Sequence, residues 1–221
     1  MYLEQRDLLG SAFVGVFAAT NDKVTLLPHN ADGEFQALAA QVLGTEVLTV
    51  SIAGSPLIGI MAALNNRCIA LPRTADKREH DALSSYFDEV IVFNPFTAVG
   101  NMMSANDHGL AVSPLVSKAE VAKLAKAFGV RASATLVAGM ENTGSCIVAT
   151  NKGFLASPRA TTTEIRKLKT LFKADGTIGS LNYGNPFVKG CILANSKGGI
   201  VGTSSTPFEL GRVDDALFFK K

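Results

Sequence analysis

The fold can be inferred from one stretch of the chain, Asn65-Asn66-Arg67-Cys68-Ile69-Ala70-Leu71-Pro72. Its pattern of a polar turn, a short apolar run and a proline returns along the chain. The turns recur at steps of 41 to 45 residues, and their leading asparagines are Asn21, Asn65, Asn106, Asn151 and Asn195. The residues that end the pattern are Pro28, Pro72, Pro114, Pro158 and, in the fifth copy, Gly202. Self-similarity at such a period is typical of an array or propeller of one supersecondary unit.

Each turn also follows a short apolar run, which we interpret as a strand. A small residue recurs in these runs, at Gly15, Gly59, Gly100, Gly144 and Gly190. Glycine within a strand often marks the close approach of another backbone. The five glycines therefore predict that five backbones meet at a narrow central axis.

After the proline, each unit continues with a polar cap, a helix of about three turns and a return strand. Ser117, Thr161 and Thr206 each stand three residues before a glutamate, which predicts capping boxes at three helix starts. Left-handed glycine stops are predicted at Gly44, Gly129 and Gly176. Return strands are predicted at 47–52, 89–93, 130–137 and 177–183.

The expected fold class is therefore α/β, as a five-fold pseudo-symmetric α/β propeller with five repeats of about 44 residues closed into a ring. Helices should lie outside, and short sheets should radiate from the centre. Since no linker-like segment separates the copies, residues 1–221 are expected to form a single domain. The five units are placed roughly at 10–56, 57–99, 100–143, 144–187 and 188–221.

Composition limits the class of protein. The chain is 47% hydrophobic and 18% charged, and it contains no apolar stretch of the length that a membrane span requires. The start of the chain lacks the apolar core of a secretory signal, and three cysteines, an odd number, favour a reducing compartment. We therefore expect a cytoplasmic protein without a membrane partner.

Charge bears on nucleic-acid binding. The net charge of +2 is small for a protein that grips many phosphates, so DNA is not an expected partner. The densest basic region, at Arg166, Lys167, Lys169 and Lys173, is interpreted as the solvated face of an outer helix. Contact of this face with an RNA-rich partner is the alternative.

Motifs that carry chemistry are almost lacking. The sequence contains no phosphate-binding loop, and His29, His80 and His108 show no metal-ligand spacing. The three cysteines, Cys68, Cys146 and Cys191, stand in apolar runs, where a cysteine behaves as a small hydrophobic residue. We therefore predict no catalytic, cofactor-binding or metal-binding residues, and we favour a binding protein over an enzyme.

Several motifs together resemble the translation initiation factor 6 family over essentially the full chain. They are Ser51-Ile52-Ala53-Gly54 leading into Ile58-Gly59, the stretch from Asn65 to Pro72, Gly100-Asn101 followed by Asn106-Asp107, Asn151-Lys152-Gly153-Phe154-Leu155, and Asn195-Ser196-Lys197-Gly198-Gly199. The resemblance implies the pentein fold, a five-bladed α/β ring. It also implies binding to the intersubunit face of the large ribosomal subunit, which keeps the small subunit from joining. The length resembles the archaeal members, which lack the long regulatory tail of the eukaryotic ones.

The resemblance also suggests which residues dock. It places Gly100 and Asn101 at the face that contacts a ribosomal protein, with ribosomal RNA nearby. By repeat equivalence, the same axis should be surrounded by Gly15, Val16, Gly59, Ile60, Ser145 and Gly190. Asn101 is the strongest candidate, because a polar side chain replaces an apolar one there. The alternative is that the glycines only permit close packing, and the turn asparagines are expected to serve left-handed turn geometry.

Two other functions remain open. Pentein-fold enzymes modify guanidino groups with a cysteine nucleophile, a histidine and acidic residues, and such a cysteine must be partly exposed with a lowered pKa. A scaffold for another partner is the third possibility. In the favoured interpretation the protein acts as a monomer without a cofactor.

Overall fold

The computed structural model describes residues 2–218, which form five similar units. The first unit consists of α1 (Val14–Phe17), β2 (Ala19–Thr20), β3 (Val24–Pro28), α2 (Gly33–Leu43) and β4 (Glu46–Val50). The second consists of α3 (Ile58–Met61), β5 (Ala63–Leu64), β6 (Cys68–Pro72), α4 (Lys77–Leu83) and β7 (Glu89–Phe93). The third consists of α5 (Val99–Met102), β8 (Met103–Ala105), β9 (Gly109–Val112), α6 (Lys118–Phe128) and β10 (Arg131–Ala134).

The last two units begin with 3₁₀ turns. The fourth consists of η1 (Thr143–Cys146), β11 (Ile147–Ala149), β12 (Gly153–Ala156), α7 (Thr162–Phe172) and β13 (Asp175–Ile178). The fifth consists of η2 (Val188–Cys191), β14 (Ile192–Ala194), β15 (Gly199–Val201) and α8 (Pro207–Leu217). Its third strand is β1 (Leu3–Gln5), from the other end of the chain.

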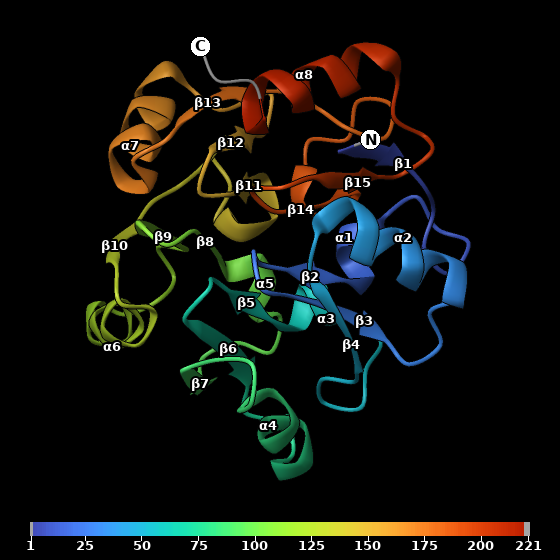
Figure 1. Ribbon diagram of the computed structural model, residues 1–221. Helices are drawn as coiled ribbons and strands as arrows, with labels where there is room; N and C mark the ends of the chain where they lie inside the picture. The colour runs from blue at the N-terminus through green and yellow to red at the C-terminus, as the bar shows by residue number, and fades with distance from the viewer. Residues whose placement is uncertain (1, 219–221) are drawn as a thin grey trace.

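Each unit carries one three-stranded sheet. The middle strand pairs antiparallel with the strand before it and parallel with the third strand. Figure 1 shows the longer helices α2, α4, α6, α7 and α8 at the periphery and the short helices α1, α3 and α5 near the middle. The structure is thus a mixed α/β fold with five small sheets, consistent with five-fold pseudo-symmetry.

The start of the chain completes the fifth sheet. Leu3, Glu4 and Gln5 of β1 pair in parallel with Gly199, Ile200 and Val201 of β15, as the return strand of each other unit pairs with its middle strand. The units predicted from the repeat begin at residue 10, so these residues lay outside them. Within the described residues, no return strand follows α8 in the fifth unit. The N-terminal segment takes that place.

The apolar runs before the turns differ from the prediction. We expected strands, but each run lies largely in a single helical or 3₁₀ turn, and a strand of only two or three residues follows that turn. In α1 and α3, the backbone N–H groups of Ala18 and Ala62 donate to the carbonyls of Val14 and Ile58. Such turns satisfy their backbone groups locally and need no partner strand.

The outer helices follow the sequence closely. Both predicted capping boxes at Thr161 and Thr206 are present, whereas Ser117 accepts from the backbone N–H of Glu120 without the reciprocal bond. The structure adds a further box at Asp76, which caps α4. These caps satisfy backbone donors at the exposed helix starts.

Two of the three predicted glycine stops are confirmed. Gly44 and Gly129 are left-handed, with φ of 59° and 70°. Gly176 is not a stop: Lys173 ends α7 with φ of 50°, and Gly176 lies in β13. A Cβ at Gly176 would overlap the ring of Phe154, so packing against that ring requires this glycine.

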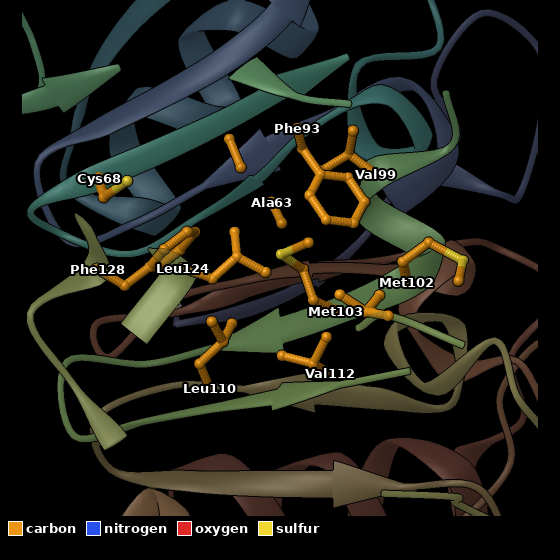
Figure 2. Close-up of a cluster of buried hydrophobic side chains, with 12 residues drawn as sticks. Ala63, Cys68, Phe93, Val99, Met102, Met103, Leu110, Val112, Leu124 and Phe128 are labelled. Carbon is orange, nitrogen blue, oxygen red and sulfur yellow. The ribbon is translucent and has the colours of Figure 1, made fainter. Parts of the chain in front are cut away.

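The hydrophobic core lies between units. One buried cluster combines Cys68 of β6 with Leu110 of β9 and with Leu124 and Phe128 of α6, as Figure 2 shows. Four further clusters combine neighbouring units in the same way, and one of them packs Leu193 of the fifth unit against residues of the first. Burial of one such side chain contributes about 1.5–3 kcal/mol, so a single unit could not hold its core by itself.

Candidate functional site

The short helical turns of the five units contact one another in sequence. α1 contacts α3, α3 contacts α5, α5 contacts η1, η1 contacts η2, and η2 contacts α1. In four of these turns the second residue is a glycine: Gly15, Gly59, Gly100 and Gly144. A Cβ on any of the four would overlap a backbone carbonyl oxygen of the preceding unit, or of the fifth unit in the case of Gly15. Backbone approach therefore requires these glycines, as predicted.

The fifth unit departs from this pattern. Its second residue is Lys189, not glycine, and Gly190 is the third residue of η2. A Cβ on Gly190 would lie 3.4 Å from Cγ2 of Val16, an ordinary contact. The prediction that Gly190 is equivalent to the four glycines is therefore wrong by one position. Gly190 corresponds instead to Val16, Ile60, Asn101 and Ser145.

A depression of about 300 Å³ opens at the third residues of these turns. Seven of the eight predicted site residues line it: Gly15, Val16, Gly59, Ile60, Asn101, Ser145 and Gly190. The eighth, Gly100, is buried and does not line it. The structure thus brings the predicted residues together at one place. Five further residues line the depression and were not predicted from the sequence: Phe13, Asn142, Asn185, Phe187 and Lys189.

Lys189 crosses from the fifth unit to the third. Its Nζ donates to the carbonyl oxygens of Gly100 at 2.6 Å and Met103 at 3.3 Å. The residue keeps part of its surface exposed, yet burial of its ammonium group lowers the pKa to about 8. Lys189 also lines an inner cavity of about 70 Å³ with walls rich in alanine. Lys189 thus lines both the depression and the inner cavity.

Side-chain amides also line the depression. Within residues 2–218, the amide groups of Asn101 and Asn142 make no hydrogen bond, and both residues are half-buried. Asn185 differs, because its Oδ1 accepts from the backbone N–H of Phe187 at 2.8 Å. The depression thus offers two amides whose donors and acceptors are available to a partner.

The turn asparagines have a structural role that differs from the prediction. Oδ1 of Asn21 accepts from the backbone N–H groups of Lys23 and Val24, and its Nδ2 donates to the carbonyl of Asn65 in the next unit. Asn65, Asn106 and Asn195 repeat this pattern. None of these asparagines adopts a positive φ, so the expected left-handed geometry is wrong.

The fourth unit is shifted by one residue. There Oγ1 of Thr150 accepts from the backbone N–H groups of Lys152 and Gly153. Asn151, which the sequence analysis aligned with the other turn asparagines, belongs to the next position of the turn. That position is occupied by Asp22, Asn66, Asp107, Asn151 and Ser196.

These five side chains form an interlocked polar cluster, which we call the turn cluster. Each of the five side chains accepts a hydrogen bond from a backbone N–H of a neighbouring unit. The carboxylate of Asp22, in the first unit, accepts from the backbone N–H of Ser196 in the fifth unit. The amides of Asn66 and Asn151 each donate to the carboxylates of both Asp22 and Asp107. Because its polar groups are paired internally, the turn cluster stabilises the fold and leaves little for a ligand.

The three cysteines do not have the exposure or the lowered pKa that a catalytic cysteine needs. All three thiols are buried, and burial raises the pKa of Cys68 and Cys191 to about 12 and that of Cys146 to about 11. Cys146 and Cys191 end 3₁₀ turns, not strands as predicted. Residues 2–218 contain no group of three histidine, cysteine or acidic side chains that could hold a metal ion. They also contain no helix that could span a membrane.

Comparison with known proteins decides the family. The model of the eIF-6 family matches residues 3–216. The chain belongs to the eIF-6 family. It is 34% identical to translation initiation factor 6 of Pyrococcus abyssi, covering 98% of this chain and 99% of that protein. The corresponding protein of Sulfolobus acidocaldarius is also 34% identical, over 98% of this chain and 99% of its own length.

A further relative, from Picrophilus torridus, is 33% identical over 97% of this chain and 99% of its own length. The three relatives named here are archaeal. All three carry the name translation initiation factor 6. Membership of the eIF-6 family therefore supports a role as a translation factor, which is consistent with a protein that is not an enzyme.

Proposed function

We propose that this chain is a single-domain, closed five-bladed propeller of the pentein type that binds the large ribosomal subunit. The depression, with Asn101 and its neighbours, docks at the intersubunit face and thereby prevents association with the small subunit. The observation that carries the proposal is that seven of the eight residues expected at the docking face line one depression in an eIF-6 family member. We further propose that the protein acts in the cytoplasm as a monomer.

The physics of such a factor requires no catalysis. A protein that occupies the shared face of one subunit lowers the apparent affinity of the other by mass action and steric exclusion. A stable contact needs about 800 Å² on each partner, which one end of a compact protein of this size can supply. Since the depression is mainly apolar and amide-lined, a ribosomal protein is its expected contact, with ribosomal RNA at the margin.

The alternative, a guanidino-modifying enzyme, receives no support from the described residues. Such an enzyme needs a reactive thiolate, whereas the three thiols are buried with pKa values of about 11 to 12. A thiol reagent distinguishes the enzyme from the binding protein. If the protein is a binding protein, all three cysteines of the native protein should react slowly.

Sedimentation of separated archaeal ribosomal subunits tests the proposal. With the protein present under joining conditions, we expect comigration with the large subunit and loss of joined ribosomes. Asn101→Ser should weaken comigration about tenfold, since it removes an amide from a docking contact. Asn30→Ser is the matched control, because Asn30 is exposed in the loop before α2. A wild-type protein that stays at the top of the gradient, with joining unaffected, would overturn the proposal.

A further inference from the structure

Lys189 stands where the other four units have glycine, and its side chain is only partly used by the fold. An ammonium group has three donors. Two of them are directed to the carbonyl oxygens of Gly100 and Met103. The third donor has no partner among the described residues, and Lys189 lines both the depression and the inner cavity.

The surroundings of this ammonium contain no carboxylate. Among the described residues that line the depression or the inner cavity, Lys189 is the only charged side chain. The short turns and first strands packed around it contribute no other titratable groups than the thiols of Cys146 and Cys191. Both thiols are neutral near pH 7, because burial raises their pKa values. A buried cation that is hydrogen-bonded to carbonyl oxygens but has no opposite charge beside it is costly to the folded protein.

We propose that the depression is a binding site for a carboxylate on an acidic segment of a partner protein, recognised by the ammonium of Lys189. The walls include the apolar side chains of Phe13, Val16, Ile60 and Phe187, and the amides of Asn101 and Asn142 are available to the segment's backbone. One cation within apolar walls fits an acidic residue flanked by an apolar one. A nucleic-acid backbone, which carries a charge on every nucleotide, would need several cations.

This inference rests on the proposed function and deepens it, because it names the chemical group that enters the docking face. It also predicts how the affinity for the carboxylate depends on pH. Burial holds the pKa of Lys189 at about 8 in the free protein, and a bound carboxylate raises it. Affinity should therefore be full below about pH 8 and fall as the pH rises through that value.

A direct test observes the ε-methylene signal of Lys189 by NMR. The probe is the dipeptide Ac-Phe-Glu-NH₂, and the controls are Ac-Phe-Gln-NH₂ and inorganic phosphate at equal ionic strength. We expect the glutamate peptide to shift the signal and to raise the pKa of Lys189 by about one unit, while the glutamine peptide has no effect. No response, or an equal response to the glutamine peptide, would overturn the proposal. An equal response to phosphate would assign the site to phosphate instead.

A second arm uses the large ribosomal subunit. Lys189→Met should weaken comigration about 30-fold or more, since it removes one partner of a desolvated charge pair. Lys126→Met, at an exposed lysine near the end of α6, should have no effect. If Lys189→Met unfolds, comigration of the wild-type protein is measured between pH 7 and 9. Comigration that weakens as the pH rises through about 8 supports the carboxylate site, and comigration that does not change contradicts it.

The two hypotheses fail in different ways. Wild-type protein that does not comigrate contradicts the proposed function, and the dipeptide titration then judges the carboxylate site by itself. Wild-type protein and Lys189→Met that comigrate equally well contradict the carboxylate site and leave the proposed function standing.

Discussion

The depression and the turn cluster are built from the same five repeats, yet they treat their polar groups in opposite ways. In the turn cluster, amides and carboxylates of neighbouring units pair with one another. At the depression, the amides of Asn101 and Asn142 stay unpaired within the described residues, and Lys189 has no carboxylate partner. We infer that the turn cluster holds the units together and that the depression is available for a partner.

Glycine substitutions should produce the largest contrast. Gly59→Ala places a Cβ on the carbonyl oxygen of Gly15, so we expect the free energy of unfolding to fall by about 3 kcal/mol or more. Gly190→Ala meets only an ordinary contact and should cost less than about 1 kcal/mol. Urea denaturation measures both, and equal losses would contradict the assignment of Gly190 to the third position.

The turn cluster should be the next most sensitive region. Asp22→Ala leaves donors of Asn66, Asn151 and Ser196 without an acceptor, which should cost about 3 kcal/mol. Asp88→Ala, at an exposed aspartate before β7, is the control and should cost little. If the folded Asp22 variant lost its affinity for the large subunit, the separation of the two regions would be wrong.

Glu209, which lies outside both regions, should make the free energy of unfolding depend on pH in acid. Its carboxylate accepts hydrogen bonds from Ser180, Gly184 and Thr206. Burial tends to raise the pKa of Glu209, but the N–H groups of Thr206 and Gly184 and the hydroxyls of Ser180 and Thr206 outweigh it, so the pKa lies below the ordinary 4.5. A lowered pKa stabilises the folded state above pH 4.5, and this contribution is lost as the pH falls through the lowered value.

Glu209→Gln tests this contribution. The substitution should cost about 2 kcal/mol near neutral pH and should reduce the loss of stability between pH 4.5 and lower values. Thermal unfolding as a function of pH measures it. An acid-induced loss of the same size in the variant would assign that loss to other carboxylates.

Asparagine-to-serine substitutions at the depression and at the turns should give the smallest difference in the free energy of unfolding, but the most specific one. Asn101→Ser should change the free energy of unfolding by less than about 0.5 kcal/mol, because its amide has no hydrogen bond to lose. Asn21→Ser removes a donor to the carbonyl of Asn65 and should cost about 1–2 kcal/mol. Comparable stability of the two variants would show that the polar groups of the two regions are not used differently.

The sequence predicts the unit and most of its elements, because periodicity, caps and glycines are local signals. Helix α7 and its capping box at Thr161, for example, follow directly from the residues. The place of β1 beside β15 could not be predicted in this way, because the pairing joins residues almost 200 positions apart and leaves no repeat signature. The short turns were mistaken for strands since four apolar residues fit either structure.

Most of the candidate site was predictable, and its main omission had a signal. A β-branched residue precedes the glycine in four turns, as in Val14-Gly15 and Thr143-Gly144, and Val188-Lys189 fits the same frame. Alignment on the glycines themselves selected Gly190 and hid the lysine. The shift between Asn151 and Thr150 has a similar origin, because threonine can accept the same two backbone hydrogen bonds as asparagine.

Hydrogen exchange of the protein, free and bound to the archaeal large ribosomal subunit, shows whether the depression is the docking face. We expect slower exchange on binding in peptides that cover 56–61 and 97–102, at the depression. Peptides that cover the turns at 65–68 and 106–109 should keep the rates of the free protein. Protection confined to those turns or to the outer helices, with unchanged exchange at the depression, would contradict docking through the depression.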